Sequence, residues 1–494
     1  MPKTLKKGGA NLDIQLTDAP MAYRPGDILL GNVVRSTPIV SAYGRIVIRL
    51  LGRTKVKISH RRGNNPSVFY RSRFNFFEDW QCVDRLVDGP VHVAPGGKPV
   101  SWSFAIAIPE HPNPKAINWE NCQDHSYLSL EHEKIARQPL PGSFSLHHNG
   151  WGPEFEAFVE YFLEAELIVG NSRKATATLP FQMRATSTLT PIRDFKPSGR
   201  PVRCTASSQR LIPGMEDAEL SFKQKAQKFF GSSAVPRFNF AAQVSAPTII
   251  QLEHPTPIPL FVRVLQDKAT TSEVIRDVAQ TITLESINLM IVAHTEVRSA
   301  SDFSGMSHFE RAQESVDLGT KWLAQRLKGQ GPLVMPDGPD AGSLNLGELI
   351  ELKLDANHVY ACGRPVMTIS QENTLHCSFA TYNTRLSHTL EWDIVFLVAG
   401  EKCTTRGQLP LKILAPSEEQ ETQKLLAMGM QPPLSMQEEV PSYRVAVENQ
   451  EALPSYTASA GQANSGSTAA PVEAHDTAES SSGMKTRKSG TADS

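Results

Sequence analysis

The sequence predicts an all-β protein: two antiparallel β-sandwiches in tandem, followed by a disordered C-terminal tail. Apolar and polar residues alternate along many short segments, which is the pattern of strands with one buried face. Turns rich in Gly, Pro and Asn separate these segments, as they do in antiparallel sandwiches. The last 79 residues hold eleven acids, five Lys or Arg residues and only two aromatic side chains, too little apolar surface for a core.

The first sandwich is expected over residues 11–185, after a basic N-terminal tail at residues 1–10. Strict alternation predicts strands at 46–50, 102–108 and 159–167. The glutamates of 159–167 would also allow a helix. The aromatic and β-branched residues there, and the turn that follows, favour a strand.

A connector is expected over residues 186–234, because prolines and glycines interrupt the alternation. Inside it, residues 219–230 are predicted to form a short amphipathic helix with Phe222, Phe229 and Phe230 on its apolar face. Packing of that face against a sandwich is favoured over contact with a membrane surface, because the helix is short and bounded by loops.

The second sandwich is expected over residues 235–415, where alternation returns, for example at 388–398. A polar stretch at 303–327 is interpreted as a loop with a helical turn, inserted between strands. The tail spans residues 416–494, and only its first part, 418–426, is predicted to form a short helix.

The charge balance, the cysteine spacing and the apolar runs of the sequence argue against several classes of function. The chain has 50 Lys and Arg residues against 51 acids, so no net charge draws it to nucleic acid or anionic lipid. The six cysteines have no C-x-x-C spacing, which argues against a zinc site and fits reduced thiols in the cytosol. No apolar run follows the N-terminal lysines as in a signal peptide, and none reaches the roughly 20 residues of a membrane span.

The sequence holds no motif for catalysis or for a cofactor. It contains no P-loop, no dinucleotide-binding glycine pattern, no nucleophile elbow and no H-E-x-x-H motif. The pair His147 and His148 lacks further ligands at metal-binding spacing, so a loop is the preferred interpretation. We expect no enzyme activity, no catalytic residues, no cofactor and no metal, although distant loops of an all-β fold can also build an active site.

Seven segments match the pattern of a known protein family. They are YRPGD (23–27), GNVV (31–34), IVIRLLG (46–52), RFNFF (73–77), VEYFLEAEL (159–167), FATYNT (379–384) and HTLEW (388–392). The first five resemble the N-terminal lobe of the fungal α-arrestins, which are arrestin-related trafficking adaptors, and the last two resemble the C-terminal lobe. The resemblance covers residues 11–415 and implies two immunoglobulin-like lobes in the arrestin fold.

The resemblance also implies a function. Proteins of this family are adaptors that link plasma-membrane transporters or receptors to a WW-domain HECT-type ubiquitin ligase, and so promote ubiquitylation and endocytosis of the cargo. We therefore expect a cytoplasmic protein that is recruited to the plasma membrane and to endosomes. A peripheral membrane contact is compatible with this function, and no nucleic-acid partner is expected.

The two tail aromatics, Tyr443 and Tyr456, each stand in a Pro-x-Tyr unit. Proline limits the entropy lost on docking and tyrosine supplies a large anchor, so such units are typical peptide ligands. The family's motif is Pro-Pro-x-Tyr, whereas an aliphatic residue takes the first position here and weakens each copy. The residues expected to bind WW domains are Val440, Pro441, Tyr443, Leu453, Pro454 and Tyr456.

A basic stretch in the first sandwich is a second candidate site. It has no acid between its cations and would project from one edge if it forms a hairpin. Acidic cytosolic tails of cargo or anionic lipid would fit it, and a solvated edge that prevents aggregation is an equal alternative. Its residues are Arg53, Lys55, Lys57, Arg61, Arg62, Arg71 and Arg73.

Two other functions stay open. An arrestin-like scaffold for a seven-helix sensor in ambient-pH signalling would carry the same lobes and tail. A β-sandwich glycan-binding protein belongs to a different class and would normally be secreted, with a signal peptide or disulfides that this sequence does not suggest.

Overall fold

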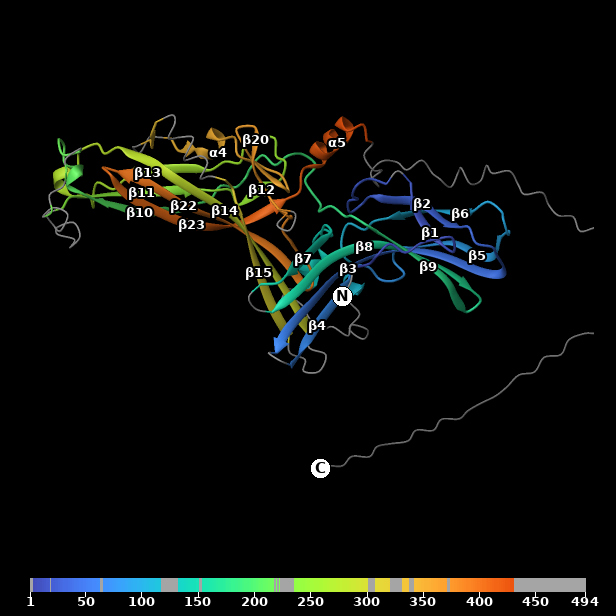
Figure 1. The fold of residues 1–494 in the computed structure, drawn as a ribbon. Helices are drawn as coiled ribbons and strands as arrows, with labels where there is room; N and C mark the ends of the chain where they lie inside the picture. Colours follow the sequence, from blue (N-terminus) through green and yellow to red (C-terminus); the bar gives the residue numbers. More distant parts are fainter. Residues whose placement is uncertain are drawn as a thin grey trace, which may run out of the picture. The chain divides into compact units, whose positions relative to one another are not determined.

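The computed structural model confirms the all-β prediction, with strands arranged in several antiparallel sheets (Figure 1). Among the strand pairs of the described residues, only β12 (Ile249–Gln251) and β23 (Glu401–Leu414) run parallel. The structure describes residues 3–17, 19–62, 65–116, 132–150, 153–216, 219, 222, 235–300, 307–319, 331–336, 342–370 and 374–430.

The N lobe combines a three-stranded sheet, β1-β2-β6, with a six-stranded sheet that follows β4-β3-β8-β7 and adds β5 and β9. Successive side chains of a strand point to opposite faces of the sheet. On β3, Ile46, Ile48 and Leu50 are buried in the core, and the residues between them are not. Its elements are β1 (Asp13–Leu16), β2 (Ile28–Arg35), β3 (Ile39–Arg62), β4 (Asn65–Asn75), β5 (Val83–Val93), β6 (Val100–Ala107), η1 (Pro114–Ala116), α1 (His132–Ala136), β7 (Phe144–His148), β8 (Glu154–Val169) and β9 (Ser172–Phe181).

The C lobe has a four-stranded sheet, β10-β11-β13-β17, a larger sheet along β12-β23-β22-β14-β15 that adds β16 and β21, and a small sheet, β18-β19-β20. On β22 every second side chain is buried along the whole strand. Besides β12 and β23, its elements are β10 (Pro201–Ser207), η2 (Gln209–Leu211), β11 (Arg237–Ser245), β13 (Phe261–Gln266), η3 (Glu273–Ile275), β14 (Ile282–Ala300), β15 (Ser307–Asp317), β16 (Leu333–Val334), β17 (Leu344–Asn345), α4 (Leu346–Leu349), β18 (Lys353–Leu354), β19 (His358–Ala361), β20 (Arg364–Thr368), β21 (Phe379–Ala380) and β22 (Thr384–Val398).

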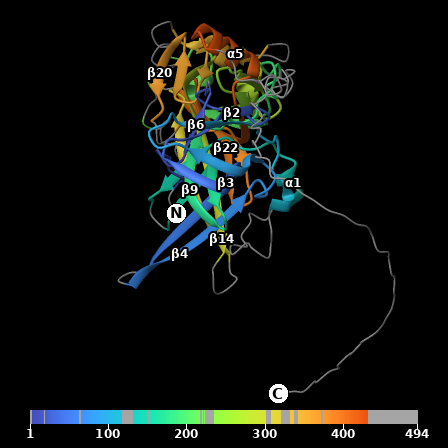
Figure 2. The ribbon, with the colours of Figure 1, turned by 90° about the vertical axis from the view of Figure 1, so that its right-hand side faces the viewer.

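The two lobes share part of one hydrophobic core. Figures 1 and 2 show the end of β14 beside the β3–β4 hairpin, and β14 contacts both strands. The N-lobe core cluster accordingly includes Val297, Ala312, Tyr382 and Leu386 of the C lobe. The ring of Tyr382 lies 5.5 Å from that of Phe74. The long strands β14 and β22 therefore contribute side chains to the cores of both lobes.

Two segments that were predicted to be irregular contain strands, so these two predictions are wrong in part. The connector at 186–234 contains β10, which pairs with β11 and buries Cys204 and Ala206. Its alternation covers only a few residues and begins at a proline, so the prediction missed it. The polar stretch at 303–327 contains β15, which is polar because few of its side chains, such as Ala312, are buried.

Both chain ends of the folded part also carry structure. Lys7 in the basic N-terminal tail bridges to Thr178 of β9. The helix predicted at 418–426 is confirmed as α5 (Glu418–Ala427), so the first part of the segment 416–494 is folded. Of the helix predicted at 219–230, only Glu219 and Phe222 lie within the described residues, and Phe222 is 89% exposed.

A capping box explains where α5 begins. The Ser417 hydroxyl accepts from the Gln420 backbone N–H, and the Gln420 side chain accepts from the Ser417 backbone N–H at 3.0 Å. Three acids in the first turn add a favourable interaction with the helix dipole. After the helix, Gly429 adopts a positive φ of 72°, which suits glycine.

Candidate partner-binding surfaces

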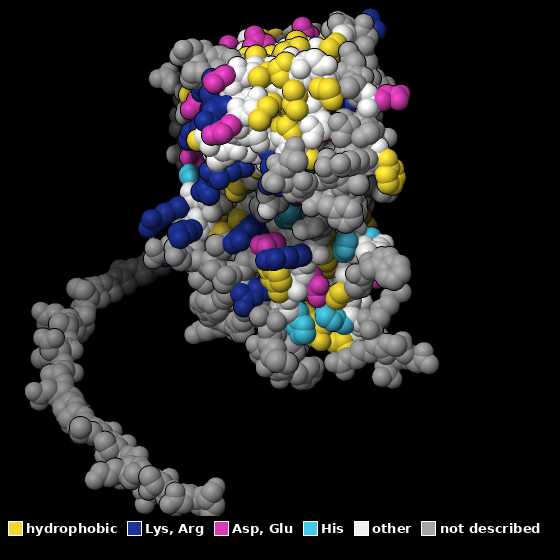
Figure 3. All heavy atoms as spheres, turned by 90° about the vertical axis from the view of Figure 1, so that its left-hand side faces the viewer, with side chains coloured by type: hydrophobic (Ala, Val, Ile, Leu, Met, Phe, Trp, Pro, Cys, Tyr) yellow, Lys and Arg dark blue, Asp and Glu magenta, His cyan; other side chains and the backbone are white. Residues whose placement is uncertain are grey.

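The predicted basic stretch does form a hairpin, from β3 and β4. Lys55 lies opposite Arg73 and Lys57 opposite Arg71, so these four cations share one face. In the surface view of Figure 3, Lys and Arg side chains lie among Asp and Glu side chains instead of forming a purely basic area.

Strand β8 supplies carboxylates to the basic face. Glu160 lies opposite Arg53, and its Oε1 is 2.6 Å from Arg53 Nε and 3.2 Å from Lys55 Nζ. The next partner along β8 is Glu156, whose Oε1 lies 3.8 Å from Lys57 Nζ. The prediction of an open cationic face is therefore wrong for these three cations. The acids come from a strand a hundred residues later, so the local sequence gave no sign of them.

Glu160 is the centre of this network. Burial opposes its ionisation, but hydrogen bonds from the Thr4 backbone N–H and the Arg53 guanidinium, with the charges of Arg53 and Lys55, lower its pKa. Lys55 is only 6% exposed, and burial and the Arg53 charge lower its pKa despite the ion pair. These residues hold the hairpin and the N-terminal segment on β8, which is a structural role.

The outer part of the hairpin remains a candidate surface for an acidic partner. Arg71 is exposed and lies over the ring of Phe69, 5.4 Å from its centroid. Arg73 is exposed too, and it has interactions of its own. The side chains of Arg61 and Arg62 lie outside the described residues, so their part in the site stays a prediction.

The opposite face of the hairpin is buried against the C lobe through hydrogen bonds. Thr54 Oγ1 donates to Asn383 Oδ1 at 2.7 Å. Asn383 Nδ2 donates to Ser72 Oγ at 2.9 Å, and Ser72 Oγ donates to the Arg298 carbonyl at 2.9 Å. Thr54, Ser72 and Asn383 have no exposed surface. We call this group the interlobe polar cluster; it fixes the register of one lobe on the other.

Nearer the hairpin tip, side chains of the hairpin pack against strand β15 of the C lobe, and two of the contacts involve histidine. The rings of Tyr70 and His308 stack at 3.5 Å, and His60 Nε2 lies 3.4 Å from Glu310 Oε1. Figure 3 shows histidine side chains gathered at the lower end of the molecule in that view. Strand β15 is thereby fastened to the β3–β4 hairpin.

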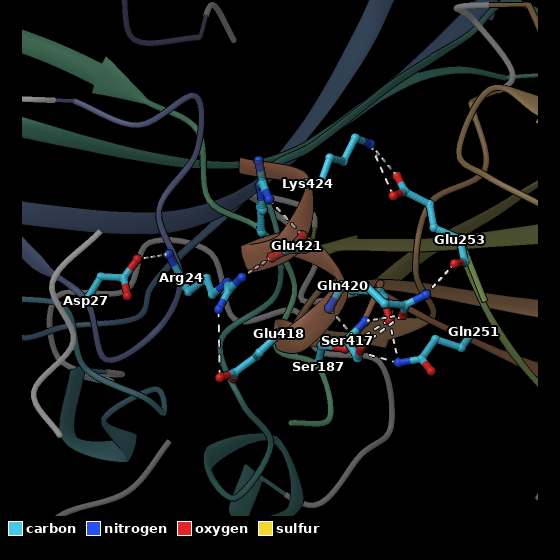
Figure 4. A network of polar contacts seen from close by, with 12 residues as sticks. Arg24, Asp27, Ser187, Gln251, Glu253, Ser417, Glu418, Gln420, Glu421 and Lys424 are labelled. Atoms are coloured by element: carbon cyan, nitrogen blue, oxygen red, sulfur yellow. Dashed lines mark hydrogen bonds and ion pairs between the residues drawn. The ribbon is translucent and has the colours of Figure 1, made fainter. Parts of the chain in front are cut away.

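Helix α5 joins the two lobes from another side (Figure 4). Glu421 pairs with Arg24 and, at 2.8 Å, with Arg184, both of which belong to the N lobe or its exit. Lys424 Nζ lies 2.9 Å from Glu253 Oε1 of the C lobe. The α5 clasp, as we call this group, comprises Arg24, Arg184, Glu253, Gln420, Glu421 and Lys424.

A tight turn at residues 24–27 sets the position of Arg24. Gly26 has φ of 91°, the Asp27 N–H donates to the Arg24 carbonyl, and the Arg24 N–H donates to the Asp27 carboxylate at 2.7 Å. Burial, aided by the α5 carboxylates and opposed by Arg24, raises the pKa of Asp27 to about 6. The motif that resembles the arrestin opening thus places one anchor of the clasp.

A cavity of about 510 Å³ lies between the lobes, with α5 forming part of its wall. Burial lowers the pKa of His376 and raises that of Cys377 to about 12, so both of these lining residues are uncharged at neutral pH. Apolar side chains dominate the wall, among them Met21, Phe144, Met183, Leu252, Leu425 and Met428.

The Pro-x-Tyr units around Tyr443 and Tyr456 lie outside the described residues, so their role stays a prediction. Within the part of the chain that the structure describes, no group of His, Cys, Asp or Glu side chains is arranged to hold a metal ion. The same residues include no helix with the length and apolarity that crossing a bilayer requires.

Comparison with known proteins adds no assignment: no protein-family model matches this chain, and no curated protein matches it.

Sequence reasoning missed the α5 clasp and the cavity. The capping box from Ser417 to Gln420 is visible in the sequence and predicts where the helix begins. The contact of Glu421 with Arg24 joins residues 397 positions apart, and no local pattern indicates it.

Proposed function

We propose that this protein is an adaptor that links plasma-membrane transporters or receptors to a WW-domain HECT-type ubiquitin ligase, promoting ubiquitylation and endocytosis of the cargo. The two lobes would bind cargo, and the tail would bind the ligase. The protein would act in the cytoplasm and at the plasma membrane and endosomes.

One observation carries the proposal: two Pro-x-Tyr units occupy the only two aromatic positions of a tail that follows two tandem β-sandwiches. The sandwiches are joined by a shared core and a clasp, so they form a rigid surface suited to recognising a partner. The exposed outer part of the β3–β4 hairpin, with Arg71, supports a contact with acidic cargo tails or lipid.

The test is a titration of the full chain against a fragment that carries two WW domains of a HECT-type ligase. We expect Tyr443→Ala and Tyr456→Ala each to weaken binding and the double variant to abolish it. Val440→Pro should tighten binding, because a second proline preorganises the extended peptide. In cells, the double variant should retain cargo at the surface.

Tyr43→Ala is the matched control, because Tyr43 is 81% exposed on the N lobe and lies outside the tail. It should bind the WW fragment like the parent. Equal binding by the double tail variant and the parent would refute the adaptor proposal, since the tail would then have no part in ligase recognition.

A further inference from the structure

The cavity beside α5 has the size and lining of a binding site. Its volume of about 510 Å³ falls within the roughly 300–1,000 Å³ typical of ligand pockets, which often lie between domains. Three methionines, Met21, Met183 and Met428, contribute to the wall. Methionine is flexible and polarisable, so such a wall adapts to apolar side chains of different shape.

Large apolar side chains are also exposed at this cavity and on the helix beside it. Met21 is 73% exposed and Met428 59%, although both line it. Leu426 on α5 is 60% exposed, and Leu189, whose carbonyl accepts from the backbone of Glu419 on α5, is 68% exposed. Met21 and Met428 thus give an apolar cavity an exposed apolar rim, and Leu426 and Leu189 expose further apolar surface on and beside α5, a combination typical of a protein-interaction site.

The first turn of α5, which forms part of the cavity wall, is acidic: it carries Glu418, Glu419 and Glu421. The charged residues that line the cavity balance, with Glu253 and Glu421 against Arg184 and Lys424. An excess of negative charge comes from the first turn of α5, where the Glu419 side chain is exposed. The cations already have carboxylate partners, so the remaining negative charge favours a basic group on any peptide that docks here.

We propose that this cavity binds a short cytosolic segment of a membrane cargo that presents two large apolar side chains next to a basic residue. The apolar side chains enter between Met21 and Met428, and the basic residue lies over the first turn of α5. Cytosolic segments next to a membrane are rich in Lys and Arg, which complements this mouth. The proposal rests on the proposed adaptor function and assigns it a cargo site separate from the basic hairpin.

The experiment measures binding of fluorescein-labelled ten-residue peptides to the full chain by fluorescence anisotropy. Each peptide carries Leu and Phe, spaced two, three or four residues apart, between two lysines. We expect at least one spacing to bind. Replacing Leu and Phe by Ser should abolish that binding, and replacing both lysines by Glu should weaken it several-fold at low salt.

Two sets of variants, each with its own control, locate the site. Met21→Asp and Met428→Asp should each weaken peptide binding at least tenfold, whereas Leu5→Asp, at a position 76% exposed on the N-terminal segment, should not. Glu419→Lys should weaken binding about threefold at low salt, by charge alone. Glu273→Lys, on the distant η3, should leave binding unchanged. Circular dichroism checks that each variant is folded.

Three outcomes would overturn the proposal: no spacing binds, Leu5→Asp acts like Met428→Asp, or the peptides bind only after removal of residues 431–494. The last result would mean that the chain's own tail occupies the cavity. Because the assay contains no ligase, its failure would leave the WW-domain titration unaffected, and loss of ligase binding would likewise leave the peptide result intact.

Discussion

Individual residues near the lobe junction have protonation states set by burial. His388 on β22 lies in the interior, with its Nδ1 2.9 Å from the Ser378 hydroxyl. Burial, with the nearby His376 and His294, lowers the pKa of His388 to about 3. The imidazole is therefore neutral in the folded protein at every pH above about 4.

This neutrality makes stability fall in mild acid. Below pH 6.5 the unfolded chain binds a proton at His388 and the folded chain does not, so the free energy of unfolding decreases by up to about 1.4 kcal/mol per pH unit until pH 3. We expect His388→Gln to remove this part of the dependence. The difference between parent and variant, measured by urea unfolding from pH 7.5 to 4.5, should vary with pH; a constant difference would contradict the assignment.

Asp27 has the opposite effect on the pH dependence of stability. Its pKa of about 6 exceeds the ordinary value of 3.8, so folded protein holds this proton more tightly than unfolded chain, and stability decreases as pH rises from about 4 to 6. Above pH 6 the penalty is constant. Asp27→Asn can still accept from the Arg24 N–H, so we expect it to stabilise the protein at pH 7.5 by roughly 1–3 kcal/mol. Below pH 4 the two proteins should unfold alike.

At the scale of elements, the β3–β4 hairpin divides its side chains between two tasks. One face carries the cations, and the other carries the interlobe polar cluster. Within the cationic face, Arg53 is tied to the buried Glu160, whereas Arg71 is exposed. The two arginines should therefore respond differently to the same substitution.

Arg53→Glu places a second carboxylate beside Glu160 and should lower the free energy of unfolding by about 3 kcal/mol or more. Arg71→Glu should change it by less than about 0.5 kcal/mol. It should instead weaken binding of a Glu-rich peptide at low salt. Urea unfolding and peptide anisotropy measure the two effects, and equal destabilisation by both variants would contradict the division.

The elements also show what a sequence can predict here. Strands such as β3, β8 and β22 alternate over many residues, so their pattern is unambiguous. The short β10 and the polar β15 lack that pattern, because tertiary pairing, and not local preference, makes them strands. The partners of Arg53 and Glu421 come from remote segments, which periodicity cannot identify.

At the scale of the whole molecule, the shared core and the interlobe polar cluster should make the lobes unfold together. We expect a single calorimetric transition for the parent. Asn383→Ala removes the amide that bonds both Thr54 and Ser72, although Ser72 keeps the Arg298 carbonyl and Thr54 keeps Thr381 as partners. It should reduce the free energy of unfolding by about 1–3 kcal/mol. It should also separate the transition into two, one for each lobe.

Asn239→Ala is the control for that experiment. Asn239 accepts from Thr205 and donates to the Thr270 carbonyl, so its contacts stay within the C lobe. It should lower the melting temperature without splitting the transition. A single transition in Asn383→Ala, or two in the parent, would contradict the coupling of the lobes.

The shared core has a further consequence during synthesis of the protein. The N lobe leaves the ribosome first, but Tyr382 and Leu386, which complete its core, follow about 200 residues later. At about 5–20 residues per second, the apolar surface around Phe74 stays uncovered for roughly 10–40 seconds. A nascent chain in that interval is a natural client for chaperones, and an isolated N lobe ending near residue 185 would retain the same uncovered surface permanently.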